Sequence, residues 1–323
     1  MTNSLFREQI LGVGGADVVA TEFLRITGER QGVSPIERHE SVPLQIQLMS
    51  PHALTLVHCI EHLYQNDILR RDDWLDLNVG CPSKRVNSRG AGAALLKDPE
   101  QLLAIISAVR EVHPGVLSVK TRVGFDSDEN YTELLKVLSC APLDFITIHA
   151  RTRCDAYSQP ANWNYLAKAV NTLPYPVIGN GDVFSAQQAA LLRDSTHVRG
   201  VMCGRGVLIN PFLLRDIQDG RLTPEPQERR AELIDFFFSL LSRYQARERR
   251  SGRRLTGPVK EFCVWFSRNE FLPGGLFTLA KRARSLDEIA EIAEIFFTSH
   301  RETPAGTNVP IRTIPESFEY HLT

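Results

Sequence analysis

The stretch "DLNVGCPSKRVNSRGAGAALL" (residues 76–96) decides how the fold of this chain is interpreted. A short apolar run ends at Gly80, and a cysteine, a proline, two cations and a glycine-rich segment follow it. Such a run is typical of a buried strand in a parallel sheet, and functional residues of these sheets follow the carboxyl ends of the strands. The pattern therefore predicts a strand that leads into a functional loop, with Cys81 as a candidate acid or nucleophile.

Similar apolar runs recur along the first two thirds of the chain, at residues 18–23, 44–49, 74–80, 117–124, 145–151, 176–183 and 200–206. Helices fit between them, for example at residues 98–112, where Asp98 suits the N-cap and Pro99 the first turn. This alternation indicates a parallel α/β sheet of the TIM (β/α)₈ barrel class. These runs give seven strands, whereas the barrel needs eight. We expect the missing strand to be the first one of the barrel, which would precede residue 1 and is absent from this chain.

The pattern changes after residue 221. Residues 224–250 carry an apolar stripe at helical period, formed by Leu233, Phe236, Phe237, Leu240, Leu241 and Tyr244. We therefore expect a catalytic barrel at residues 1–221, a small all-α domain at 222–302 and a disordered tail at 303–323. Between Arg221 and Lys260 the cations outnumber the acids, which predicts either a solvated helix end or a phosphate-facing patch.

The composition narrows the class of protein. The chain has 323 residues, 43% of them hydrophobic, and a formal net charge of −1, which by itself indicates no acidic partner. Six scattered cysteines without a C-x-x-C pair argue against a zinc or thioredoxin-type motif and favour a reduced, cytoplasmic protein. No apolar segment has the length of a membrane span. The five cysteines other than Cys81 fit small buried residues.

Polar residues follow the other predicted strands as well. Lys120 and Arg122 are two apart, so both point to one face of their strand, and two cations there are costly unless they meet an anion or reach water. His149 lies at the end of another predicted strand. It either contacts a ligand or is a core histidine whose hydrogen bonds are satisfied within the protein. Glycine-rich segments after the last two strands, around Gly181 and Gly204, favour a phosphorylated cofactor.

Taken together, "NVGCPSKRVNSRGAGAALL", "SVKTRVG", "IHART" and "IGNGDV…GVMCGRG" resemble the tRNA-dihydrouridine synthases, and "ATEFLR", "CPSKRVN" and "KEFCVWFSRNEF" resemble most the bacterial C-type branch. The resemblance covers the chain except its tail. It implies an FMN-binding barrel with a C-terminal helical domain, and reduction of a D-loop uridine of tRNA, at position 16, with NADPH as the reductant. No metal, membrane or protein partner is implied.

The resemblance also implies residue roles. Cys81 is the general acid that protonates C5 of the uridine. The flavin-contacting positions are Gln47, Lys120, His149, Asn180, Gly181, Asp182, Gly204 and Arg205, the last two at the phosphate. The positions that contact tRNA are Arg25, Asn78, Arg122, Lys260 and Lys281, and Lys84 and Arg85 suit neighbouring phosphates.

Two alternatives stay open at this level. One is a flavin oxidoreductase that acts on a small pyrimidine. The other is a truncated homologue that binds tRNA but is catalytically impaired.

Overall fold

The computed structural model describes residues 3–31, 33 and 36–300. The chain divides into a sheet unit (Asp17–Val183 and Gln188–Met202) and a helical unit (Met1–Ala16, Phe184–Gln187 and Cys203–Thr323). The tail predicted at residues 303–323 lies outside the described residues. Within the described part, no helix is long and apolar enough to cross a membrane.

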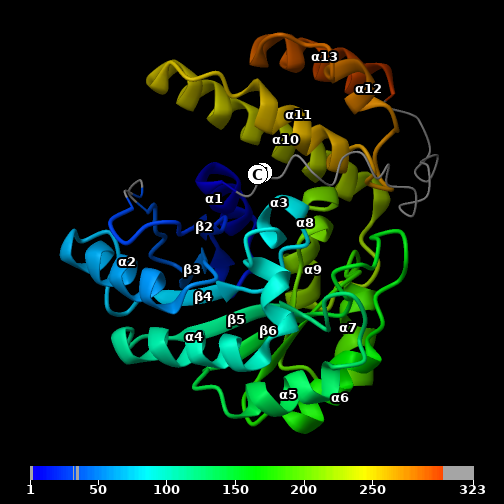
Figure 1. The fold of residues 1–323 in the computed structure, drawn as a ribbon. Coiled ribbons are helices and arrows are strands. Elements are labelled where there is room, and N and C mark those ends of the chain that lie inside the picture. The colour runs from blue at the N-terminus through cyan, green and yellow to red at the C-terminus, as the bar shows by residue number, and fades with distance from the viewer. Residues whose placement is uncertain (1–2, 32, 34–35, 301–323) are drawn as a thin grey trace. The chain divides into compact units, whose positions relative to one another are not determined.

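The sheet unit holds an eight-stranded parallel sheet (Figure 1). Its strands are β1 (Val19–Ala20), β2 (Leu24–Arg25), β3 (Leu44–Met49), β4 (Trp74–Asn78), β5 (Leu117–Arg122), β6 (Phe145–His149), β7 (Val177–Asn180) and β8 (Gly200–Met202). Its helical elements are α2 (Ala53–Gln65), α3 (Lys84–Asn87), the 3₁₀ helix η1 (Gly92–Lys97), α4 (Pro99–Val112), α5 (Tyr131–Ser139), α6 (Asn164–Thr172) and most of α7 (Ala186–Thr196).

The strands follow the order β1-β3-β4-β5-β6-β7-β8, and β2 also pairs with β3. The strand predicted at residues 18–23 is thus shorter than expected, with β1 at Val19–Ala20, and the second short strand, β2, lies beyond the predicted range. Val19 pairs with Leu44 and Leu24 pairs with Leu48, so β1 and β2 lie in succession along one edge of β3, with the chain leaving the ladder between them. Among the described residues no pairing joins β8 to β1 or β2. The sheet is thus a parallel half-barrel with surrounding helices. The TIM-barrel class of parallel α/β fold that the strand-helix alternation predicts is confirmed in this form.

Strand β3 shows how the sheet acquires a polar inner face. All six of its residues are buried. The Gln45 and Gln47 side chains donate to Ser118 on β5 and to Asp76 on β4. Successive side chains of a strand point to opposite faces, so Leu44, Ile46 and Leu48 occupy the other face of the sheet. The polar residues of β3, β4 and β5 consequently meet on one surface.

The start of α4 confirms the expected cap. The Asp98 carboxylate accepts a hydrogen bond from the Gln101 N–H at 3.0 Å, and Pro99 occupies the first turn.

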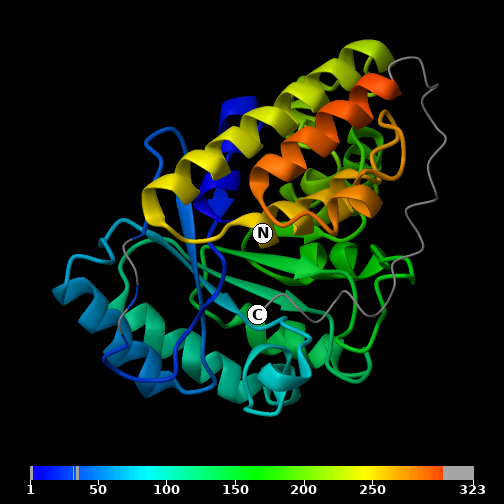
Figure 2. The same cartoon turned by 90° about the horizontal axis from the view of Figure 1, so that it is seen from above.

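The helical unit contains α1 (Ser4–Val13), α8 (Arg205–Ile209), α9 (Leu213–Asp219), α10 (Pro226–Ser251), α11 (Thr256–Phe266), α12 (Leu276–Ala280) and α13 (Leu286–Ser299). The predicted apolar stripe of α10 is buried throughout, and α10 runs beside α13 (Figure 2). Residues from α1, α8 and α9 share one hydrophobic core with α10 to α13. For this reason the compact units divide at residues 16/17 and 202/203, and also around the short segment 184–187, whereas the sequence led us to expect a boundary at residue 221.

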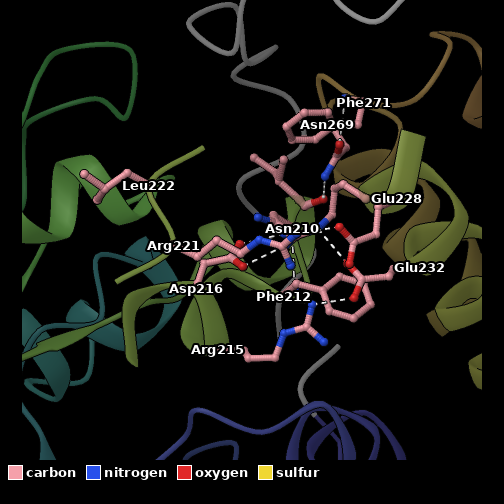
Figure 3. Close-up of polar contacts among 12 residues, drawn as sticks. Asn210, Phe212, Arg215, Asp216, Arg221, Leu222, Glu228, Glu232, Asn269 and Phe271 are labelled. Carbon is pink, nitrogen blue, oxygen red and sulfur yellow. Dashed lines mark hydrogen bonds and ion pairs between the residues drawn. The ribbon is translucent and has the colours of Figure 1, made fainter. Parts of the chain in front are cut away.

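A polar cluster that includes Asp216 on α9 and Glu232 on α10 joins these two helices within the helical unit (Figure 3). Its central cation is Arg229. Arg229 is fully buried and donates to both carboxylate oxygens of Asp216, at 2.6 Å each. Its Nε donates to Glu232 at 2.9 Å, and its guanidinium lies over the Phe212 ring. A buried arginine that is paired and hydrogen-bonded in this way fixes the geometry of the helices that carry its partners.

Candidate active site

Cys81 lies in the loop after β4, and both polar atoms of its backbone are held. Its N–H donates to the side-chain oxygen of Asn78 at 3.0 Å. Its carbonyl oxygen accepts from the side-chain amide of Asn87 at 2.9 Å and from the N–H of Ala93 at 3.1 Å. The cysteine is therefore fixed from the strand before it and from the segment after it.

Gly92 packs directly against Cys81. Its φ is +62°, and an added Cβ would lie 2.9 Å from the Cys81 Cβ and 3.0 Å from Val86 Cγ1, so a glycine is required there. The Cys81 side chain is half-buried. Burial raises the pKa of its thiol, and the charges of Arg122 and Lys120 oppose this rise only in part. A thiol that stays protonated at neutral pH suits a proton donor better than a nucleophile.

A chain of hydrogen bonds runs beneath this loop. Ser118 Oγ donates to Asp76 at 2.7 Å, and the Gln47 amide nitrogen donates to the other Asp76 oxygen at 2.6 Å. The Asn78 amide nitrogen donates to the Gln47 oxygen at 2.7 Å. Asn78 in turn accepts from Cys81, so three neighbouring strands are connected to the cysteine by side-chain hydrogen bonds.

Two charged groups of opposite sign lie at this network. Burial raises the pKa of the Asp76 carboxyl to about 6. Burial, together with the positive charge of Arg122, lowers the pKa of the Lys120 ammonium to about 8. Lys120 makes no hydrogen bond or ion pair with any residue that the structure describes. Its ammonium is thus available to an anion or a polar ligand.

Arg122 is buried and binds two loops of the sheet unit. Its Nε donates to the Gly80 carbonyl at 3.0 Å and its Nη1 donates to the Thr152 carbonyl at 2.7 Å. Its Nη2 donates to the Tyr157 hydroxyl at 3.2 Å. These bonds join the cysteine loop to the loop after β6. A contact of Arg122 with a uridine stays a prediction.

His149 and Asp182 are connected through Arg151. The Nη1 of Arg151 lies 3.0 Å from His149 Nε2, and its Nη2 donates to both Asp182 oxygens at 2.8 and 2.7 Å. Asp182 also accepts from the N–H of Ala161 at 2.7 Å. The Asp182 carboxylate therefore connects the loop after β7 to the loop after β6. Its predicted flavin contact is untested.

Asn180, the last residue of β7, and Gly181, which follows it, each make a hydrogen bond to a neighbouring segment. The Asn180 amide donates to the Met202 carbonyl at 2.8 Å. The Gly181 carbonyl accepts from the indole N–H of Trp163 at 3.0 Å. Gly181 has a φ of +131°, a conformation that favours glycine.

Gly204 and Arg205 belong to the helical unit. Gly204 is the N-cap of α8, and the Arg205 guanidinium lies over the Phe184 ring at 5.4 Å from its centroid. Their predicted phosphate contact remains a prediction.

Comparison with known proteins identifies the family. The family model "Dihydrouridine synthase (Dus)" matches residues 1–266. The chain belongs to the dihydrouridine synthase family. It is 27% identical to the tRNA-dihydrouridine(16) synthase of Aquipseudomonas alcaligenes, over 90% of this chain and 95% of that protein. It is 30% identical to the tRNA-dihydrouridine(16) synthase of Pseudomonas syringae pv. tomato, over 67% and 71%. A probable tRNA-dihydrouridine synthase 1 of Synechocystis is 39% identical, over 45% and 41%.

Membership in the dihydrouridine synthase family makes the chain an oxidoreductase and implies a flavin. Two residues on the inner face of the sheet fit such a ring. Lys120 offers an ammonium without a hydrogen-bonded partner in the described structure. Gln47 uses one donor and one acceptor within the network, so its amide retains one N–H and one lone pair for a ligand.

Three arginines of the sheet unit form a cationic surface close to the cysteine loop. Burial lowers the pKa of Arg25, and the positive charges of Arg89 and Arg85 lower it further, which places the three groups near one another. Arg85 and Arg89 are exposed, as is Lys84. None of the four has an ion-pair partner among the described residues. Arg25, Lys84 and Arg85 were expected from the sequence, whereas Arg89 was not.

The other two predicted tRNA contacts lie in the helical unit. Lys260 is on α11 and is half-buried, and Lys281 follows α12 and is exposed. Their contact with tRNA is untested.

Sequence reasoning missed Asp76, Ser118, Asn87 and Arg151. A signal was present for the first two, because Asp76 is two residues before Asn78 and Ser118 two residues before Lys120. Each pair therefore points to one face of its strand. Nothing in the spacing indicated that Asn87 and Arg151 bind loop carbonyls and a distant carboxylate.

Proposed function

We propose that this protein reduces a uridine in the D-loop of tRNA, at position 16, to 5,6-dihydrouridine, with FMN as the cofactor and NADPH as the reductant. The observation that carries the proposal is Cys81: a half-buried thiol of raised pKa, held by both backbone polar atoms, at the end of a strand in a chain of the dihydrouridine synthase family. The two relatives named for position 16 support the choice of uridine.

Different residues of the chain have different roles in the proposed reaction. When bound, FMN would supply the hydride that C6 of the uracil receives. Cys81 donates the proton to C5, and burial keeps the thiol protonated until that step. Lys120 places its positive charge at the ring and so stabilises negative charge there. Gln47, His149, Asn180, Gly181 and Asp182 are the proposed flavin contacts of the sheet unit.

The cationic surface favours tRNA over a free pyrimidine as the substrate. A small pyrimidine needs no row of exposed arginines, whereas a polynucleotide presents a phosphate at each nucleotide. Arg25, Lys84, Arg85 and Arg89 supply the cations, and Asn78 is the proposed contact with the uracil.

The test compares two cysteine variants on tRNA transcripts that lack modification. In C81A we expect flavin absorbance to persist and dihydrouridine formation to fall by about 10²–10⁴, the usual effect of losing a general acid. The matched control is C140A. The expectation that all cysteines other than Cys81 are buried is wrong for Cys140 and Cys154, which are exposed, and Cys140 makes none of the contacts of the site described above. Mass spectrometry of D-loop fragments measures the product. Normal product formation by C81A would contradict the assignment. A wild-type chain without flavin absorbance would instead favour the catalytically impaired alternative.

A further inference from the structure

Asp76 has no assigned role, yet it lies at the base of the hydrogen-bond chain that reaches Cys81. It is fully buried on β4. One of its oxygens accepts from Ser118 on β5 and the other accepts from Gln47 on β3. Ser118 also accepts from the Gln45 amide at 2.7 Å. The carboxylate therefore receives donors from the strands on both sides of its own.

The groups at the two ends of this series of hydrogen bonds fix the donor and the acceptor of each bond in it. An ionised carboxylate only accepts hydrogen bonds, so Gln47 has to present its amide nitrogen to Asp76. The Gln47 oxygen then faces Asn78 and accepts from the Asn78 nitrogen. The Asn78 oxygen remains for the loop, where it accepts from the N–H groups of Gly80 and Cys81 at 3.1 and 3.0 Å.

The loop end imposes the same direction independently. Backbone N–H groups only donate, so Asn78 has to turn its oxygen toward them and its nitrogen toward Gln47. A carboxylate at one end and two N–H donors at the other thus leave a single arrangement for the two amides between them. Without the carboxylate, only the two loop N–H groups would oppose rotation of the amides, and the amide nitrogen of Gln47 would lose its buried acceptor, which is costly.

We propose that Asp76 is a positioning residue that sets the orientation of the Gln47 and Asn78 amides, and thereby holds the backbone of Cys81 in place. It contacts neither substrate nor cofactor. The assignment of a catalytic task to Cys81 rests on the proposed function, whereas the positioning itself is a property of the folded chain. The orientation also decides which hydrogen-bonding atoms Gln47 retains for a ligand.

Hydrogen–deuterium exchange of the loop amides tests the proposal without tRNA and without an activity assay. The measurement follows peptides that span residues 79–83 and uses a peptide of α5 as the internal reference. In D76L the acceptor is lost, and we expect the Gly80 and Cys81 amides to exchange about tenfold faster, since one hydrogen bond of ordinary strength is removed. In D76N the side-chain oxygen can still accept from Gln47 while its nitrogen donates to Ser118. We expect exchange within about twofold of the wild type there.

Two further variants separate positioning from general loosening. Q47L removes the hydrogen bonds that connect Asp76 to Asn78 and should therefore reproduce the D76L effect. If D76L does not fold, Q47L alone tests the proposal. S118A is the matched control, because it removes the other hydrogen bond of Asp76 and leaves the Gln47 bond in place. Unchanged exchange in both D76L and Q47L would overturn the proposal. Equally fast exchange of the loop amides in S118A would overturn it too, since general loosening of the sheet would then explain the faster exchange. Failure of the proposed reaction would leave all of these exchange rates unaffected.

Discussion

Replacing Gly92 by alanine is the sharpest test of how tightly the cysteine loop is packed. The new methyl group would lie 2.9 Å from the Cys81 Cβ and 3.0 Å from both the Cys81 carbonyl oxygen and Val86 Cγ1. The backbone φ of +62° adds a second cost, because left-handed backbone is unfavourable for a residue with a Cβ.

The two costs can be estimated separately. Left-handed backbone costs an L-residue about 1–2 kcal/mol. Overpacking of a close-packed site costs about 1–3 kcal/mol more. We therefore expect G92A to lower the free energy of unfolding by roughly 2–5 kcal/mol. We also expect slower dihydrouridine formation, because relief of the contact moves Cys81.

Gly90 supplies a matched control two residues away. Its φ is +74°, but a Cβ there would meet only the Pro51 Cβ, at 3.6 Å, which is ordinary contact. G90A should thus lose only the backbone term, about 1–2 kcal/mol, and keep its activity. Urea denaturation of both variants, with product measured by mass spectrometry of the D-loop, gives the comparison. If G92A and G90A lose the same stability and G92A stays fully active, the crowding at Cys81 is not a constraint on the loop.

The remaining predictions concern the cations. R85A/R89A should weaken tRNA binding and lower the slope of log Kd against log salt by about 2, one unit for each lost phosphate contact; an unchanged slope would remove both arginines from the interface. The pKa of Lys120 is about 8 in the folded chain against 10.5 for an ordinary lysine. The unfolded chain therefore binds more protons between these two pH values, so this group makes the free energy of unfolding rise with pH across that window. K120M should flatten the rise in urea denaturation, and a parallel profile would refute the lowered pKa.

The sheet could be predicted because its signal is local. Apolar runs of strand length alternate with amphipathic segments, and Asp98 with Pro99 marks a helix start that the structure confirms. The second short strand, β2, was not predicted, because the apolar run at residues 18–23 ends before Leu24. Only the pairing with β3 identifies Leu24–Arg25 as a strand.

The boundary predicted at residue 221 falls inside the helical unit of the structure. Helices α8 and α9 precede residue 221 and follow the last strand directly, as barrel helices would. Their apolar residues nonetheless belong to the same core as α1 and α10. A sequence pattern shows that a helix has an apolar face, but it does not show which neighbouring element covers that face.

Lys120 and Arg122 show most clearly where the sequence stops being informative at the site. The two residues are two apart on β5, so the alternation of side chains gives them the same face and the same expected exposure to a ligand. In the structure their surroundings differ: Arg122 donates to the carbonyls of Gly80 and Thr152, whereas Lys120 has no hydrogen bond in the described chain. That difference arises because the loops after β4 and β6 bring their carbonyl groups to Arg122 and not to Lys120. The sequence of β5 contains no information about the paths of these loops. The guanidinium can hold both loops because its donors diverge, and the single ammonium is left for a ligand. The same two-residue step along one strand therefore yields one residue that maintains the cysteine loop and one whose ammonium remains available to a ligand.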